Sequence, residues 1–121
     1  MEKDLIKVFK VEEVQAEEVY KGDRRRRLAA GKNMTLNMYE QDPGAITPEH
    51  SHPQELMAVV LKGKVEVQFN GKKYVLGPGE GYHIPGNVMH GPFTVVGDET
   101  VVYIDVLSPP REIEEYAGKK K

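Results

Sequence analysis

The chain has 121 residues and a formal net charge of −2; 39% of its residues are hydrophobic and 30% are charged. These values are typical of one globular domain, so we treat residues 1–121 as a single domain with its core at about 30–110. The balanced charge gives no indication of a nucleic-acid or membrane partner, and the lack of cysteine excludes disulfides and thiolate chemistry. With no signal peptide and no apolar run of roughly 20 residues, we expect a cytoplasmic protein.

The N-terminal quarter is patterned weakly. Residues 5–9 alternate between apolar and polar, which predicts a short first strand, and residues 11–20 support no more than a helical turn or two. Residues 24–27 are four consecutive arginines, of which a strand would send two to each face. We interpret them as a solvated edge strand protected from aggregation by its charge, with a role in substrate binding as the alternative.

From residue 34 onward, apolar and polar residues alternate in short runs separated by Gly and Pro turns. The expected strands are 34–39, 56–61, 65–69, 74–76, 82–84, 93–96 and 101–107. Asn70-Gly71 is the dipeptide preferred in a type I′ hairpin turn, because both positions need positive φ. Nine or ten short strands with almost no helix predict an all-β sandwich or barrel, followed by a polar C-terminal tail.

Three histidines stand out by their spacing. His50 and His52 are one residue apart, and alternate side chains of an extended segment leave the same face, so this pair presents two imidazoles side by side. His90 lies 38 residues beyond His52, at the end of the stretch GEGYHIPGNVMH. We predict that the fold brings the three together as a metal site. Neutral imidazoles bind Mn, Fe, Co, Ni, Cu or Zn, so the identity of this divalent transition metal stays open.

At these residues the chain resembles the cupins, a superfamily of small barrels also called double-stranded β-helices or jelly rolls. Two glycines frame the H-x-H pair at the spacing of the first cupin motif, and a glycine and a proline precede His90 at the spacing of the second. The matching residues are Gly44, His50, His52 and Gly63 in the first motif, and Gly79, Pro85 and His90 in the second. The resemblance implies a cupin barrel with the three histidines bound to one metal ion.

The fourth ligand position of the first motif departs from the cupin pattern. Seven residues before Gly63, where cupins carry a carboxylate or Gln, this chain has Leu56. Glu55 is one residue short, and a one-residue slip in a strand turns the side chain to the opposite face. Glu55 is therefore a candidate ligand only if a β-bulge redirects it. His83, close to His90 across a short loop, is a second candidate.

Two longer stretches resemble the pectin-degradation cupins, which convert 4,5-unsaturated uronates from pectin and alginate breakdown into linear keto-uronates. The first is RRRRLAAGKNMTLNMYEQDPGA with HSHPQE after it, and the second is VVYIDVLSPPR near the end. The resemblance implies a sugar-acid substrate and places the functional Asp and Arg of that group on Asp105 and Arg111. It departs at Leu56, where the group has a metal-binding Gln, and at Leu107, where it has an aromatic residue.

Asp105 poses a conflict between pattern and resemblance. Val102, Ile104 and Val106 form an all-apolar face of the last strand, and plain patterning makes that face the core and leaves Asp105 in solvent. The resemblance requires Asp105 in the pocket as a general acid or base. Both faces can be partly buried if the sheet also forms a dimer contact. Arg111 is likewise either a carboxylate clamp or a surface residue.

These observations favour a metal-dependent enzyme that acts on unsaturated uronates, with the metal as Lewis acid and Asp105 as acid or base. Two alternatives remain open. One is a three-histidine Fe(II) dioxygenase, and the other is a non-catalytic module that binds a metal or a sugar acid, which would follow if Leu56 disables the chemistry. We also expect a homodimer, because pairing would cover exposed sheet edges.

Overall fold

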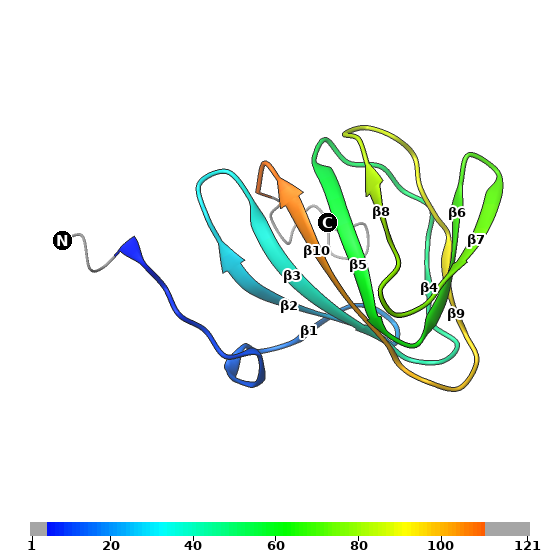
Figure 1. Cartoon of the computed structure of the whole chain (residues 1–121), viewed down its shortest axis with the longest axis horizontal. Helices are drawn as coiled ribbons and strands as arrows, with labels where there is room; N and C mark the ends of the chain where they lie inside the picture. Colours follow the sequence, from blue (N-terminus) through cyan, green and yellow to red (C-terminus); the bar gives the residue numbers. More distant parts are fainter. Residues whose placement is uncertain (1–4, 111–121) are drawn as a thin grey trace.

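The computed structural model describes residues 5–110, and their regular structure is almost entirely β. Two antiparallel sheets face each other (Figure 1). The larger sheet consists, in spatial order, of β1 (Glu17–Tyr20), β2 (Asp23–Ala30), β3 (Thr35–Gln41), β10 (Val101–Ser108), β5 (Glu55–Lys62) and β8 (Gly81–Ile84). The smaller sheet consists of β4 (Ile46–Thr47), β9 (Phe93–Val96), β6 (Lys64–Phe69) and β7 (Lys72–Leu76). This arrangement confirms the predicted all-β sandwich.

Strands β3 and β5 to β10 form where alternation predicted them, and the expected hairpin turn joins β6 to β7. Asn70 and Gly71 have φ values of 52° and 81°, both in the left-handed region that a type I′ turn requires. Between residues 5 and 110, no helix is long and apolar enough to cross a membrane. A short 3₁₀ turn, η2 (Val11–Glu13), precedes the first strand.

The core lies between the sheets and consists of side chains that alternate inward from both. Val60 and Val101 from the larger sheet are about 1% exposed or less, as is Val67 from the smaller sheet. Tyr39 and Tyr103 face each other across the β3–β10 pair, with ring centroids 4.9 Å apart in a stacked geometry. Burying alternate side chains of two facing sheets is the usual way in which a sandwich forms its core.

The N-terminal prediction was wrong. Residues 5–9 form no strand, and they run away from both sheets (Figure 1). Val8 is 90% exposed and Leu5 is 78% exposed. Alternation alone predicted a strand there, but a strand also needs a neighbour to accept its hydrogen bonds, and the sheet begins only at β1.

The prediction that the four arginines form a solvated edge strand was also wrong. They lie in β2, which is covered by β1 and is not the edge of the sheet. Arg25 points inward and is 3% exposed, with its Nη2 donating to Oε1 of Glu17 at 3.3 Å. Arg24 and Arg26 point outward and form ion pairs with acidic groups that follow on β3 or just after it. The run is therefore half-buried and largely neutralised, instead of solvated.

The two faces of β10 are the reverse of what plain patterning predicts. Asp105 is 4% exposed and shares the inner face with Val101, Tyr103 and Leu107, all buried. The apolar residues Val102, Ile104 and Val106 are half-buried on the outer face. This placement agrees with the resemblance, because it points Asp105 into the space between the sheets.

Candidate metal centre and its cavity

His50 and His52 lie in the segment between β4 and β5 and not within a strand, so the expectation of a strand-borne pair needs correction. His50 instead forms an isolated antiparallel bridge with His90. The backbone N–H of each donates to the carbonyl oxygen of the other, at 2.9 Å and 2.8 Å. This bridge is what joins the two motifs, because it fixes the segment before β9 against the segment after β4.

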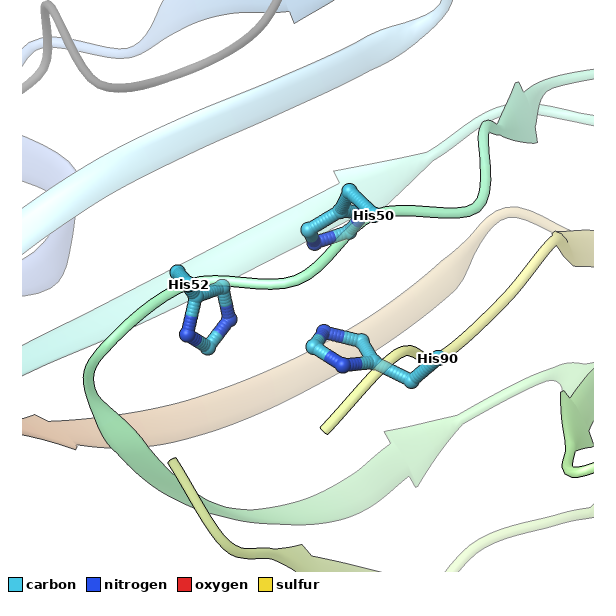
Figure 2. A group of neighbouring side chains, drawn as sticks. All are labelled: His50, His52 and His90. Carbon is cyan, nitrogen blue, oxygen red and sulfur yellow. The ribbon is translucent and has the colours of Figure 1, made fainter. Parts of the chain in front are cut away.

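The three imidazole rings converge on one point (Figure 2). Ring centroids are 4.4 Å apart for His50 and His90, 4.9 Å for His52 and His90, and 5.5 Å for His50 and His52. One nitrogen from each ring lies within 4.8 Å of the other two. His52 and His90 are buried, at 5% and 2% exposure, while His50 is half-buried at the mouth.

The second nitrogen of each ring identifies its tautomer. Nδ1 of His50 lies 2.8 Å from the carbonyl oxygen of Pro48, Nδ1 of His52 lies 3.0 Å from that of Gln54, and Nδ1 of His90 lies 2.8 Å from that of Val88. A carbonyl oxygen only accepts, so each Nδ1 carries the hydrogen and donates it, and the lone pair of each ring is on Nε2. Such support of the outer nitrogen is typical of metal-binding histidines, and the residues fit a divalent transition metal.

The histidines line a narrow cavity between the two sheets. Its volume is about 30 Å³, which is room for a cation and a very few other atoms. Half of the remaining lining residues are aromatic; they are Tyr20, Tyr39, Tyr82, Phe93 and Tyr103. Two carboxyl groups, those of Asp23 and Asp105, lie in the same wall. The cavity therefore combines three histidines that could hold a metal ion with groups that can transfer protons.

Asp105 is held in place by a neighbouring strand. Nδ2 of Asn37 on β3 donates to Oδ1 of Asp105 at 3.0 Å, and both residues are buried and directly paired across the sheet. Burial raises the pKa of the Tyr82 phenol well above its usual range, and the negative charges of Asp105 and Asp23 raise it further. Tyr82 therefore stays protonated and can donate a hydrogen bond into the cavity.

A family model described as a cupin domain matches residues 37–107, which is more than half of the chain. The chain is a cupin. The match contains all three histidines and Asp105, and both sheets contribute strands to it. The fold that the sequence motifs implied is thereby established, and the centre described above occupies the interior of the cupin barrel.

Solved structures similar to this cupin cover most of its length. KdgF from Halomonas sp. shares 28% identity with it, with a TM-score of 0.79, over 87% of this chain and 96% of that one. An RmlC-like cupin from Shewanella frigidimarina shares 26% identity, with a TM-score of 0.74, over 84% and 88%. The polyketide cyclase RemF from Streptomyces resistomycificus shares 28% identity, with a TM-score of 0.73, over 86% and 79%. A search of curated proteins finds no match.

Glu55 does not join the three histidines in this cupin, so its assignment as a fourth ligand needs correction. Its side chain points outward from β5 and is about half exposed. There its Oε2 lies 2.6 Å from Nε2 of His83, the other candidate ligand, whose side chain is also exposed. The register of β5 is regular at this point, so no bulge turns Glu55 inward. The two candidates contact each other on the outside of the barrel.

The inward position belongs to Leu56, which is 7% exposed and lines the cavity. The site thus faces an apolar side chain where cupins usually carry a fourth ligand. Arg111, the other residue implied by the resemblance, lies outside the described residues.

Sequence reasoning missed two buried polar residues beside the site. Gln54 is 3% exposed; its carbonyl oxygen accepts from Nδ1 of His52, and its side-chain Nε2 donates to the carbonyl oxygen of Pro110 at 3.3 Å. Asp23 is 2% exposed and lies in the cavity wall. Gln54 lies in the HSHPQE stretch, two residues beyond His52, and this closeness to a candidate ligand could have marked it as part of the site. Asp23 gave none, because it precedes the arginine run and looks like a surface residue.

Proposed function

We propose that this cupin is a metal-dependent enzyme that converts a 4,5-unsaturated uronate into the linear keto-uronate. The observation that carries the proposal is the placement of a buried carboxyl, Asp105, in the same cavity as the three histidines. The resemblance to the sequence motifs of the pectin-degradation cupins and the similarity to KdgF from Halomonas sp. support it. A structural role alone would not require an ionisable group on the inner face of β10, because burying an unused carboxyl costs stability.

The reaction is an isomerisation with two proton transfers. A base removes the proton of the hydroxyl on the anomeric carbon, the bond from that carbon to the ring oxygen breaks, and an aldehyde and an enolate form. A proton then adds to the carbon at the far end of the C=C bond, and the enolate becomes a ketone. Atoms and electrons balance without an oxidant or a second substrate. Asp105, oriented by Asn37, is the base that takes the hydroxyl proton in this scheme.

Nε2 of His50, His52 and His90 would hold the metal ion. Once bound, such an ion supplies Lewis-acid polarisation of a substrate oxygen. The protonated Tyr82 would donate a hydrogen bond to an oxygen that gains charge as the ring opens.

The size of the cavity sets a condition on this proposal. Ordinary ligand pockets have volumes of about 300–1,000 Å³, whereas this cavity has about 30 Å³. A sugar acid would therefore need the lining side chains to move apart before it could bind. Tyr20 and Tyr82 line the cavity and are half-buried, so we take them as the side chains that would move.

The proposal is tested by following the ultraviolet absorbance of an unsaturated uronate with the purified, metal-loaded chain. We expect the absorbance to disappear as the conjugated C=C bond is lost. Asp105→Asn should slow the reaction on the order of 10²–10⁴-fold while metal content per chain stays the same. An unchanged substrate with the metal-loaded wild-type chain would refute the proposal. Glu55→Gln, on the outside of the barrel, is the matched control and should keep full activity.

A second candidate function is an Fe(II) dioxygenase. It is favoured by the set of candidate ligands, which consists of three histidines. Glu55 points away from them and therefore adds no carboxylate ligand. Oxygen uptake by the Fe(II)-loaded chain would support this alternative. Oxygen consumption equal to that of free Fe(II) would exclude it.

We also propose that the chain forms a homodimer through the outer face of the larger sheet. Apolar side chains from three adjacent strands lie together there; they are Leu36 and Met38 on β3, Val102, Ile104 and Val106 on β10, and Met57, Val59 and Leu61 on β5. Met57 is 57% exposed and Leu61 is 47% exposed. An apolar patch of this kind marks a contact surface in a soluble protein. A second copy would cover it with the same patch.

A further inference from the structure

Asp23 is a buried carboxyl that the scheme above does not use. It begins β2, on the opposite side of β3 from β10. Its side chain is 2% exposed and forms part of the wall of the cavity that contains the histidines and Asp105. A carboxyl group in such a place has no stabilising ion pair to explain it, since the nearby Arg24 points outward to Asp42. Burial of an ionisable group inside a cleft is a common mark of a functional residue.

The two oxygens of Asp23 are in different situations. Oδ2 accepts from Nε2 of Gln41 and from Oγ1 of Thr47, each at 3.2 Å. Nε2 of Gln41 also donates to Oγ1 of Thr47 at 2.9 Å, which closes a small buried network. Oδ1 is buried and has no hydrogen-bond partner among the described residues. Because two donors occupy Oδ2, a proton bound by Asp23 sits on Oδ1, the oxygen that has no hydrogen-bond partner.

The surroundings of Asp23 favour its protonated form. Burial raises its pKa from 3.8 to about 6, while the bonds from Gln41 and Thr47 and the charge of Arg24 act in the opposite direction. The other titratable groups that line the cavity are Tyr20, Tyr39, Tyr82, Tyr103, Asp105 and the three histidines. A carboxyl that is partly protonated near neutral pH is suited to giving up a proton, and this is how paired carboxyls divide acid and base roles.

We propose that Asp23 is the general acid that delivers a proton from Oδ1 to the carbon of the enolate formed by ring opening. This inference rests on the proposed uronate isomerisation and divides its two proton transfers between two residues. Asp105 takes the hydroxyl proton, and Asp23 gives a proton to the carbon, whose C=C electron pair forms the new C–H bond. Exchange with solvent then restores both carboxyls. The network from Gln41 and Thr47 positions Asp23 and keeps its proton on the cavity side.

The test follows which face of the carbon receives hydrogen. In D₂O, the metal-loaded wild-type chain should place one deuterium on a single face of the new CH₂ group, as read by NMR of the product. Asp23→Asn keeps an oxygen for Gln41 and Thr47 but has no acidic proton to give. With this variant we expect kcat to fall on the order of 10²–10⁴-fold and the deuterium to appear on both faces, because solvent then protonates the released enol.

The pH dependence gives a second readout that needs no variant. For an acid, kcat/KM of the wild-type chain should fall about tenfold per pH unit above about 6. A kcat/KM that stays level or rises from pH 6 to 8 would overturn the role. So would an Asp23→Asn variant with single-face deuteration and wild-type kcat. If the wild-type chain leaves the uronate unchanged, the proposed function itself fails. Asp42→Asn, on the surface, is the matched control and should behave as wild type in both readouts.

Discussion

Replacing Asp23 by Asn should stabilise the chain at neutral pH, although it removes a charged side chain. The folded protein raises the pKa of this carboxyl from 3.8 to about 6, chiefly by burial. At about 1.4 kcal/mol for each tenfold change in proton affinity, the ionised form lowers the free energy of unfolding by about 3 kcal/mol. Asn has nearly the same shape and still accepts a hydrogen bond, so this penalty disappears in the variant.

The direction of the pKa shift determines the pH range in which Asp23 affects the free energy of unfolding. A carboxyl with a raised pKa in the folded state stabilises that state fully below about pH 3, where the carboxyl is protonated in both the folded and the unfolded chain. This contribution is lost as pH rises through about 4 to about 6, and the loss levels off above about 7. The difference in unfolding free energy between Asp23→Asn and wild type should thus be near zero at about pH 3 and about 3 kcal/mol at about pH 8. Urea denaturation of both metal-free proteins at these two pH values measures it.

A variant that is less stable than wild type at pH 8, or a difference that does not change with pH, would refute this reasoning. Asp42→Asn provides a control of opposite sign. The hydrogen bond from Arg24 is the main cause that lowers the pKa of Asp42, so its contribution to stability is present at neutral pH and lost in acid. The Asp42→Asn variant should therefore have a lower free energy of unfolding than wild type at about pH 8, but not at low pH.

Further predictions concern the metal centre and the outer face. His52→Ala should lower metal content per chain to background in elemental analysis, whereas Glu55→Ala should leave it unchanged; equal metal content in both variants would contradict the placement of the site. Leu56→Gln should tighten metal binding in a competition titration with a chelator, because this side chain lines the cavity; an unaltered affinity would count against that. Ile104→Lys should convert a dimer into a monomer in sedimentation analysis, while Val75→Lys on the exposed side of β7 should not; a wild-type chain that is already monomeric would end the dimer proposal.

Much of the fold could be predicted because its signals are local. Alternation in 65–69 and 93–96 reflects the two-residue period of a strand, and the Asn70-Gly71 turn depends on the φ of two residues. The same reasoning failed at residues 5–9, where alternation is present but no neighbouring strand accepts the hydrogen bonds. It failed again at Arg25, because the sequence does not reveal that β1 covers β2.

The candidate site divides in the same way. The spacing of His50, His52 and His90 was enough to predict that they meet, since the motif spacing specifies which turns and strands separate them. The one-residue slip also predicted that Glu55 points away unless a bulge intervenes, and the regular register of β5 decides against the bulge. The antiparallel bridge between His50 and His90, which holds the triad together, has no sequence signature of its own.

By itself, the sequence determined strands β3 and β5 to β10, the Asn70-Gly71 turn and the three imidazoles of this cupin. All of these follow from spacing along the chain and from the conformations that single residues allow. Only the tertiary structure decided which face of β10 points inward and which carboxyls enter the cavity. A strand with apolar residues on one face and a mixed face on the other can be buried either way, and the choice depends on what the facing sheet covers. Asp23 and Asp105 lie on strands far apart in the sequence, and they share a cavity because β3 pairs with both strands.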